Sequence, residues 1–437
     1  MKQYLGTDRC QCGKVHTVAI DAVITGKGAI AYLPEFVEKF GAKKPFLLAD
    51  CNTFAAAGAR VCAALESKHI TYGKYVFQND SLEPDEAAVG AAIMHFDTSC
   101  DLIIGIGSGV INDIGKILSN VSGRKYIIVA TAPSMDGYAS ATSSMSMDGL
   151  KVSLGSRCAD VIIGDTDVLK NAPAHMLKAG LGDMLAKYVS IAEWRIAHII
   201  TGEYYCERVA DLIRGALKKC VDNAEGLLKR DEQAIEAVFE GLVIGGIAMA
   251  YAGVSRPASG VEHYFSHVWD MRGLEFGTQV DLHGIQCAMG TLQAVKLYDK
   301  IRTLKPDREK AKAYVDGFSF DDWQVQLRAF LGNSAETMIA QEAKEQKYDK
   351  VKHPARYKTI SENWDRILQI LDEELPDYQR LSEIMDTIGI SKDLQTIGVD
   401  SATAKMTFKA TKDIRDKYVL SRLAWDLGVL EELCELL

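Results

Sequence analysis

The chain has 437 residues, 48% of them hydrophobic, which is enough for two domains of ordinary size, each with its own core. Its formal net charge of -9 argues against a broad basic surface for nucleic acid or anionic membranes, so any phosphate group must be bound at a local site. The ten cysteines are scattered, and the first residues, MKQYLGTDRCQCGKVH, lack an apolar signal-peptide core; both features favour the reducing cytoplasm over disulfide-linked secretion.

Three residues near the N-terminus, Cys10, Cys12 and His16, have side chains of the kind that bind metals. Their spacing, CxCGxxH, matches no standard structural zinc site, and the segment supplies no fourth ligand. We therefore predict uncoordinated thiols in an exposed hairpin.

From residue 18 to about 168, short apolar runs alternate with helical stretches. The runs are VAIDAVI, KPFLLAD, DLIIGIG and KYIIVAT. This alternation predicts an α/β domain with a mostly parallel, Rossmann-like sheet covered by helices. The last two runs are apolar throughout, as expected for strands buried on both faces.

After residue 170 the pattern changes to long amphipathic stretches rich in Ala, Leu, Glu and Lys, which predict an all-α domain. We place the two domains at residues 1–170 and 171–437. The longest uncharged apolar stretch, 241–254, is shorter than the roughly 20 residues that span a bilayer. It predicts a buried helix and no membrane insertion.

Gly105, Gly107 and Gly109 follow an apolar strand directly and precede a helix. In such a turn the backbone can approach a phosphate while the amides of the helix N-terminus face it. The spacing differs from GxGxxG, however, and glycine-rich turns of this kind also occur for packing alone. Both interpretations stay open on the local motif.

Polar side chains also follow two other predicted strands. Asp50 ends the run PFLLAD, where a carboxylate can accept hydrogen bonds from ribose hydroxyls or instead cap a helix starting near Thr53. The loop after KYIIVAT places Thr131, Ser134 and Ser140 around Asp136. These groups suit a cofactor and a polyol, or they satisfy the local backbone.

Three of the nine histidines lie within 21 positions. His263 and His267 are separated by one helical turn, and His283 follows. Imidazoles bind Zn, Ni and Fe, and Asp183, behind a glycine pair, is the best candidate for an accompanying carboxylate. One carboxylate and two imidazoles would leave coordination positions for substrate oxygens. The alternative is that each histidine is an ordinary hydrogen-bonded residue.

The segments GIGSGVIND, TAPSMDGYAS, GLGDMLAKY, SGVEHYFSH and LHG occur in this order over residues 105 to 284. Together they resemble the sn-glycerol-1-phosphate dehydrogenase family, within the iron-type alcohol dehydrogenase and dehydroquinate synthase-like superfamily. The likeness extends to about residue 300 and is weak beyond it. It implies a dinucleotide-binding domain over 1–170 and a metal- and substrate-binding domain over 171–437.

The resemblance also implies roles for individual residues. One divalent metal, nickel or zinc rather than iron, would be held by Asp183, His263 and His283, and substrate would contact Asp136, Asp183 and His267. NAD(H) or NADP(H) would be bound by Asp50, Gly109, Val110, Ile111, Asn112, Asp113, Thr131, Ala132, Pro133, Ser134 and Ser140.

The implied reaction is a reversible, metal-dependent, NAD(P)H-linked reduction of dihydroxyacetone phosphate to sn-glycerol 1-phosphate in the cleft between the domains. His267 is the provisional proton donor because imidazole titrates near neutral pH. For the substrate phosphate we rank Arg256 before Lys151 because of its fork of donors. The alternative is that each is an ordinary surface charge. A homodimer is expected by analogy with the superfamily.

One departure from the family is visible, since Ile285 stands where members often have the Glu of HGE. The lost carboxylate can alter the groups that orient the metal ligands. Three other functions remain: a dehydrogenase of an unphosphorylated polyol such as glycerol, a cyclising lyase like dehydroquinate synthase, and a non-catalytic relative.

Overall fold

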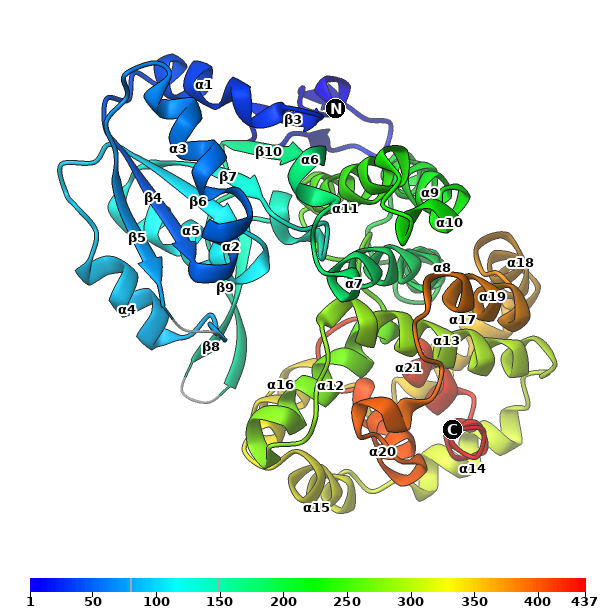
Figure 1. The fold of residues 1–437 in the computed structure, drawn as a ribbon. Coiled ribbons are helices and arrows are strands. Elements are labelled where there is room, and N and C mark those ends of the chain that lie inside the picture. Colours follow the sequence, from blue (N-terminus) through cyan, green and yellow to red (C-terminus); the bar gives the residue numbers. More distant parts are fainter. Residues whose placement is uncertain (79–80, 148–149) are drawn as a thin grey trace. The chain divides into compact units, whose positions relative to one another are not determined.

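The computed structural model describes residues 1–78, 81–147 and 150–437, without the side chains of Asp8, Leu150 and Lys151. The chain forms two compact units (Figure 1). Unit 1 comprises Met1–Met184 and Arg208–Val254, and unit 2 comprises Leu185–Glu207 and Ser255–Leu437.

Unit 1 contains a six-stranded sheet with the strand order β3-β10-β7-β6-β4-β5, and all neighbouring strands are parallel. The strands are β3 (Ala22–Gly26), β4 (Pro45–Asp50), β5 (Gly73–Phe77), β6 (Leu102–Gly107), β7 (Lys125–Ala130) and β10 (Val161–Asp165). Every residue of β6 is buried, because helices cover both faces of the sheet. The predicted parallel sheet is confirmed.

Different helices cover the two faces of this sheet. The 3₁₀-helix η2 (Ala29–Tyr32), α1 (Leu33–Lys39) and α3 (Ala59–Glu66) share one apolar core with alternate strand residues. On the other face, α5 (Gly109–Ser122) packs so closely that a Cβ at Gly115 would lie 2.5 Å from the Tyr126 hydroxyl. The other helices in this part of the chain are α2 (Cys51–Thr53), the π-helix η3 (Phe54–Gly58), α4 (Glu86–Met94) and α6 (Thr166–Leu169).

Two antiparallel hairpins and a single-turn helix complete the α/β part. The first hairpin joins β1 (Asp8–Arg9) and β2 (Val15–His16), and the second joins β8 (Thr142–Met147) and β9 (Leu150–Gly155). The 3₁₀-helix η4 (Asp136–Ala139) precedes β8. A short 3₁₀-helix, η1 (Lys2–Tyr4), opens the chain.

Four helices beyond residue 170 belong wholly or mainly to unit 1, so the units divide the chain elsewhere than at the change in composition. They are α7 (Ala174–Leu185), α9 (Glu207–Asp222), α10 (Ala224–Leu227) and α11 (Glu232–Ala252). α11 packs against η4, where a Cβ at Gly246 would lie 2.7 Å from Ala139 Cβ. Residue 170 therefore marks where helices begin, and part of this helical segment completes the α/β unit.

α11 contains the apolar stretch noted in the sequence. Within the described residues it is the one helix long and apolar enough to cross a membrane by length and composition, and 72% of its most apolar window is buried. This burial agrees with the predicted buried helix.

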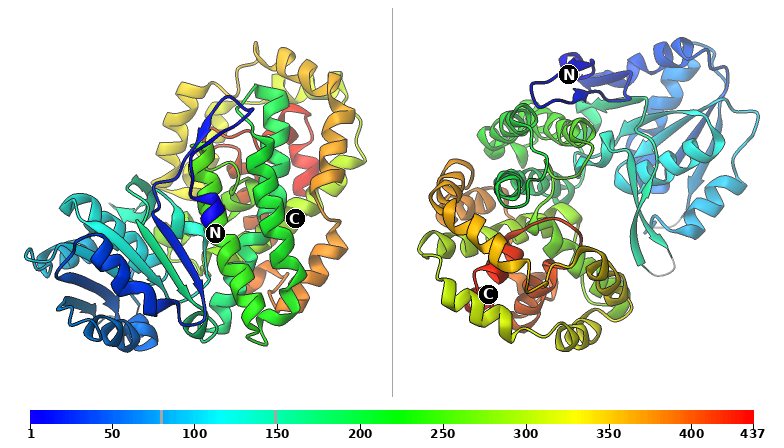
Figure 2. Two further views of the ribbon diagram at one scale, coloured as in Figure 1. Left: turned by 90° about the horizontal axis from the view of Figure 1, so that it is seen from above. Right: turned by 180° about the vertical axis from the view of Figure 1, so that it is seen from behind.

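Unit 2 consists of helices and connecting loops in the part of the chain that the structure describes (Figure 2). The predicted helical C-terminal region is confirmed. The helices are α8 (Lys187–Thr201), α12 (Val261–Phe276), α13 (His283–Arg302), α14 (Arg308–Gly317), α15 (Phe320–Leu331), α16 (Ser334–Glu345), α17 (His353–Glu362), α18 (Trp364–Glu374), α19 (Tyr378–Ile388), η5 (Leu394–Ile397), α20 (Ser401–Thr411), α21 (Leu420–Asp426) and α22 (Leu430–Cys434).

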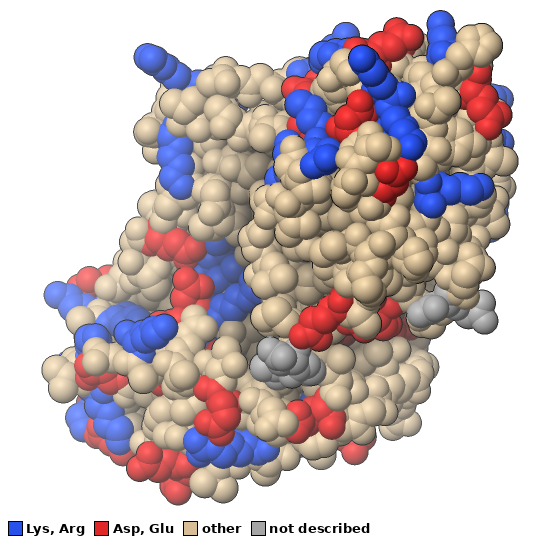
Figure 3. Space-filling model, turned by 90° about the vertical axis from the view of Figure 1, so that its left-hand side faces the viewer, with Lys and Arg blue, Asp and Glu red and all other residues tan. Residues whose placement is uncertain are grey.

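Charged side chains of both signs are interspersed on the molecular face drawn in Figure 3, with uncharged areas between them. No broad basic surface occurs among the described residues on this face.

Candidate cofactor and metal sites

The carboxyl ends of β4, β6 and β7 lie at one edge of the sheet, because these three strands are parallel neighbours. The strand order reverses between β4 and β6, since the chain continues outward from β4 to β5 and then returns to β6 on the other side. Open α/β sheets bind ligands beside such a reversal. Asp50 ends β4 and Gly107 ends β6, so both lie where a dinucleotide is expected.

The three glycines of the β6–α5 turn differ in their surroundings. A Cβ at Gly105 would lie 2.4 Å from the Tyr126 hydroxyl, and one at Gly107 would lie 2.5 Å from Ile111 Cβ, so packing requires both glycines. At Gly109 a Cβ would meet only the Met135 side chain, at 3.6 Å or more. Gly109, the first residue of α5, is therefore the position where backbone is open to a ligand.

The loop after β7 is fastened to this turn. Thr131 N donates to Gly107 O over 3.1 Å, and the buried hydroxyls of Ser108 and Ser134 lie 2.6 Å apart. The structure thus brings the predicted cofactor residues of both loops together within unit 1.

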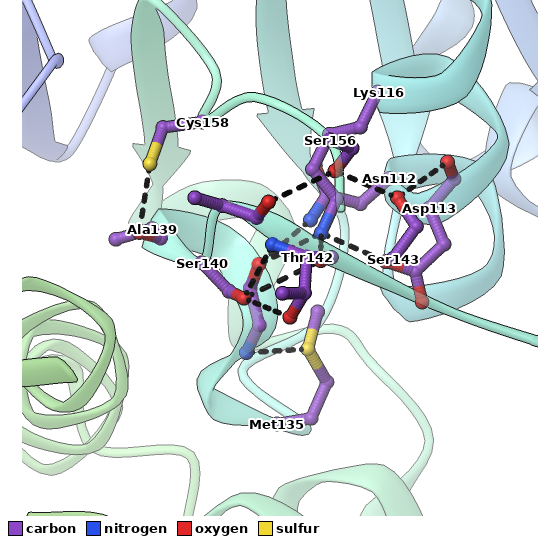
Figure 4. A network of polar contacts seen from close by, with 12 residues as sticks. Asn112, Asp113, Lys116, Met135, Ala139, Ser140, Thr142, Ser143, Ser156 and Cys158 are labelled. Carbon is purple, nitrogen blue, oxygen red and sulfur yellow. Dashed lines mark hydrogen bonds and ion pairs between the residues drawn. The ribbon is translucent and has the colours of Figure 1, made fainter. Parts of the chain in front are cut away.

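Side chains from α5 hold the next part of that loop (Figure 4). Asn112 Nδ2 donates to Gly137 O over 3.0 Å, and the buried Lys116 donates to Thr142 O and forms an ion pair with Asp113. The Asn112 Oδ1 atom is buried without a hydrogen-bond partner among the described atoms. Such an acceptor is costly to leave unsatisfied, and a ligand donor would satisfy it.

Two side chains predicted to contact the cofactor, those of Asp50 and Ser140, form hydrogen bonds with residues close to them in the sequence. Asp50 accepts a hydrogen bond from Thr53 N over 2.9 Å and caps α2, so the capping alternative is confirmed. Ser140 Oγ lies 2.9 Å from Thr142 Oγ1 and accepts from Thr142 N. Contacts of Asp50 and Ser140 with a cofactor stay predictions.

Of the two glycines before Asp183, Gly180 is required by close packing. A Cβ at Gly180 would lie 1.8 Å from the Pro133 carbonyl oxygen, so only glycine lets α7 approach the loop this closely. The approach brings the buried Asp183 carboxylate within 2.9 Å of Asp136 N, from which it accepts a hydrogen bond. The candidate metal ligand and the candidate substrate residue are neighbours in unit 1.

Unit 2 brings the imidazoles of His263 and His283 together, with ring centroids 5.0 Å apart. His263 Nδ1 lies 2.8 Å from Glu262 Oε1, and His283 Nδ1 lies 3.0 Å from Ser266 Oγ. A carboxylate partner fixes the proton on Nδ1 of His263, which leaves the lone pair of Nε2 available to a metal. Glu262 therefore supplies the kind of orienting carboxylate that Ile285, buried on α13, does not.

Cys287 is a functional candidate that the sequence analysis missed. Its Sγ lies 3.5 Å from His283 Nε2, and one donor atom each from His263, His283 and Cys287 fall within 4.8 Å of one another. Burial raises the pKa of the thiol, but the two imidazoles outweigh it and the pKa is lowered. Its i+4 spacing from His283 on a predicted helix could have signalled this contact.

Two buried carboxylates lie at the start of α12. Glu193 accepts from Val261 N over 2.9 Å, and Glu262 accepts from Gly260 N over 2.6 Å. Burial and the neighbouring Glu262 raise the pKa of Glu193 to about 8. A Cβ at Gly260 would lie 2.6 Å from Glu193 Oε2, so the glycine gives this pair room.

His267 lies close to the other two histidines, but its electrostatic surroundings differ. Burial lowers its pKa well below the usual value, and Arg415, the other histidines and Lys417 lower it further. The ring is neutral at neutral pH, which differs from the near-neutral titration assumed from the sequence. Arg415 and Lys417 come from a C-terminal segment in which the sequence predicts no individual site residue.

The residue ranked first for the substrate phosphate, Arg256, is used elsewhere. Its guanidinium is buried and donates to both Glu203 carboxylate oxygens, over 2.7 and 2.6 Å, and to Tyr418 O. This interpretation of Arg256 was wrong, because a bidentate buried pair uses its donors within the fold. The alternative, Lys151, has a side chain outside the described part of the chain.

Known proteins resemble this chain in sequence and in fold. The family model described as iron-containing alcohol dehydrogenase matches residues 24–173. A glycerol dehydrogenase from Schizosaccharomyces pombe superposes with a TM-score of 0.61 at 17% identity, over 95% of this chain and 90% of that one. An iron-containing alcohol dehydrogenase from Thermococcus thioreducens gives a TM-score of 0.61 at 12% identity, over 95% and 99% of the two chains. These structures confirm the predicted fold class.

Two relatives named glycerol-1-phosphate dehydrogenase, with NAD(P)+ in the name, are more similar in sequence. The Bacillus licheniformis protein is 27% identical over 434 residues, covering 98% of this chain and 94% of its own length. This alignment includes the residues beyond 300, where the resemblance found in the sequence is weak. The Halalkalibacterium halodurans protein is 33% identical over 293 residues, covering 66% of this chain and 73% of its own length. On this evidence, the chain belongs to the glycerol-1-phosphate dehydrogenase family.

Proposed function

We propose that the protein catalyses the metal-dependent, NAD(P)H-linked, reversible reduction of dihydroxyacetone phosphate to sn-glycerol 1-phosphate. The observation that carries this proposal is the pair of imidazoles, His263 and His283, each with its Nδ1 atom engaged by a neighbouring side chain. Ring nitrogens oriented in this way are typical of metal ligands.

The proposed ligands of one divalent metal are Asp183, His263 and His283. Imidazole nitrogens with a thiol nearby favour zinc or nickel over hard cations such as magnesium. Such a metal would polarise the substrate carbonyl as a Lewis acid, and NADH or NADPH would supply the hydride.

The α/β part, residues 1–170, would bind the dinucleotide. Gly109 to Asp113 and Thr131 to Ser134 form the proposed cradle, with Asp50 and Ser140 contributing. The open backbone at Gly109 and the unsatisfied acceptor of Asn112 support this assignment. The helical part, residues 171–437, would bind metal and substrate.

The proton for the new alkoxide oxygen is assigned to a relay through His267. Because its ring is neutral, it would pass a proton from solvent rather than store one. Asp136, one hydrogen bond from Asp183, would contact a substrate hydroxyl.

For the substrate phosphate we replace Arg256 with Arg415 and Lys417. Burial, together with the positive neighbours Arg256 and Arg415, lowers the pKa of Lys417 to about 7, although Glu262 and Glu203 act in the opposite direction. An excess of positive charge in a buried position favours an anion. This observation favours the phosphorylated ketone over an unphosphorylated polyol such as glycerol.

The test mixes metal-stripped protein with NADH, and then with NADPH, and follows the loss of nicotinamide absorbance. Dihydroxyacetone phosphate and dihydroxyacetone are compared, each with nickel or zinc added. We expect oxidation that requires both the metal and the phosphorylated ketone. If neither ketone is reduced with either metal, the proposal fails and a cyclising lyase that recycles bound NAD becomes the better hypothesis.

Two variants sharpen the test. His263→Ala should abolish metal-dependent turnover, whereas His95→Ala, at an exposed position in unit 1, should leave it unchanged. Arg415→Met should raise KM for dihydroxyacetone phosphate and leave turnover of dihydroxyacetone unchanged. An equal effect on both ketones would argue against the phosphate assignment.

We further propose a cytoplasmic homodimer. All ten cysteines carry thiols, as expected in a reducing compartment. Sedimentation of the purified protein tests the dimer, and fractionation of the cells tests the compartment.

A further inference from the structure

The N-terminal hairpin brings together three donor atoms outside the proposed catalytic residues. One donor atom each from Cys10, Cys12 and His16 lie within 4.8 Å of one another. His16 is 1% exposed and both thiols are only half-buried, so the hairpin forms as predicted but its histidine is not exposed.

The backbone explains how the two cysteines converge. Gly13 N donates to Cys10 O over 3.1 Å, and Cys10 N donates to Lys14 O over 3.1 Å, which closes a tight turn between β1 and β2. Gly13 has φ +87°, which an L side chain rarely adopts. The turn thus brings the Cys10 and Cys12 side chains close to that of His16.

A second contact orients the imidazole. His16 Nδ1 lies 3.0 Å from the carbonyl oxygen of Tyr251, and the His16 ring stacks on the Tyr251 ring with centroids 5.2 Å apart. A carbonyl can only accept, so Nδ1 carries the proton and Nε2 presents its lone pair. Nε2 lies 3.5 Å from Cys12 Sγ.

We propose that Cys10, Cys12 and His16 bind a structural zinc ion. With Zn–S near 2.3 Å and Zn–N near 2.05 Å, a tetrahedral ion separates sulfur and nitrogen ligands by about 3.6 Å. The Cys12–His16 distance agrees with this value. A hydrogen bond from one thiol to the imidazole would explain Cys12 alone, whereas a metal also explains the convergence of Cys10.

The hairpin lies where a bound ion would stabilise the contact between the N-terminal segment and α11. Lys14 Nζ donates to Ala252 O over 2.9 Å, and the Tyr251 hydroxyl donates to Tyr4 O over 2.5 Å. These bonds join the N-terminal segment to the C-terminal end of α11. Zinc bound by Cys10, Cys12 and His16 would rigidify this junction within unit 1.

The first experiment needs no substitution. The full-length protein, with zinc bound or removed by a chelator, is treated with iodoacetamide, and alkylation of each cysteine is followed by mass spectrometry. We expect zinc to slow alkylation of Cys10 and Cys12 and to leave Cys51 and Cys62, also half-buried, unaffected. Any further protected thiol other than Cys287, which lies beside the proposed site at His263 and His283, would identify a fourth ligand. Equal rates for Cys10 and Cys12 with and without zinc would overturn the proposal.

The second experiment counts metal. The double variant Cys10→Ser, Cys12→Ser should lose one zinc ion per chain, while Cys51→Ser, Cys62→Ser should lose none. Cobalt substituted into the wild type should show a thiolate-to-cobalt charge-transfer band that the first double variant reduces. This loss does not depend on whether His263 and His283 hold a second ion, so the two proposals fail separately. An unchanged zinc content in Cys10→Ser, Cys12→Ser would refute the site.

Discussion

The closest backbone approach around a glycine in unit 1 is that of α7 to the loop after β7, and it predicts a large effect of Gly180→Ala. The added Cβ would lie 1.8 Å from Pro133 O, whereas ordinary contact begins at 3.4 Å. The helix and the loop must therefore separate by roughly 1.6 Å, the difference of these two distances. Because the obstructing atom is backbone, no rotamer change relieves the clash.

The free-energy cost follows from two opposing terms. Overpacking at the upper end of its usual range costs about 3 kcal/mol, and replacing glycine in a helix returns about 1 kcal/mol. We expect Gly180→Ala to lower the free energy of unfolding by about 2 kcal/mol. Separating α7 from the loop should also weaken NADH binding, since the loop carries Thr131 to Ser134 in the proposed cradle.

The assays are urea unfolding followed by circular dichroism and NADH titration followed by fluorescence. Gly215→Ala is the matched control, because Gly215 lies in α9 and a Cβ there would meet nothing within 4 Å. The control should stabilise unit 1 by up to about 1 kcal/mol and leave NADH affinity unchanged. If Gly180→Ala proves as stable as Gly215→Ala, the packing argument is refuted.

Three further predictions concern unit 2. Glu262→Gln should lower metal affinity about 10- to 100-fold, measured by competition with a chelating dye, because the orienting carboxylate of His263 is lost; unchanged affinity would remove Glu262 from the site. Because the folded pKa of Glu193 is raised, the free energy of unfolding of the wild type should fall as pH rises from about 4.5 to about 8, by at most about 1.4 kcal/mol per pH unit. Glu193→Gln should show a smaller fall over the same range. If the wild type and the variant lose stability in parallel as pH rises, the raised pKa of Glu193 is contradicted. Arg256→Met should lower the free energy of unfolding by about 2–3 kcal/mol, less than for a fully buried ion pair because Glu203 is partly exposed. KM for dihydroxyacetone phosphate should stay unchanged. A raised KM would show that Arg256 contacts the substrate phosphate after all.

The sequence predicts the parallel sheet well because strands buried on both faces appear in it as continuous apolar runs. β4, β6 and β7 each appear as an apolar run, and the sheet edge then follows from topology alone. The division of the chain into two units is harder to predict from the sequence. α11 reads as a buried helix from its composition, but nothing in the sequence says that it packs on η4 and completes unit 1.

The candidate site shows the same limit at the level of side chains. Spacing relates His263 to His267, but Arg256 was misassigned because its partner Glu203 lies 53 positions away in the chain. Cys287 and Arg415 were missed for related reasons: one is a thiol among many, and the other lies in a charged segment without a motif. Contacts formed only in the folded structure decide which of several similar residues can bind a ligand, and the sequence alone does not show these contacts.

His263 and His267 illustrate how such partners divide chemical roles between two residues on one helix face. Glu262 lies beside His263 and fixes its Nδ1 proton, which leaves the Nε2 nitrogen of His263 available for the proposed role as a metal ligand. Burial and the positive charges of Arg415 and Lys417 keep His267 neutral. The cations that disfavour a charged imidazole would also favour an anionic phosphate, and for this reason we propose that they contact the substrate. The i, i+4 spacing presents two equivalent histidines, and under the proposed function the surrounding charges would make one a metal ligand and the other a neutral contact for a phosphorylated ketone.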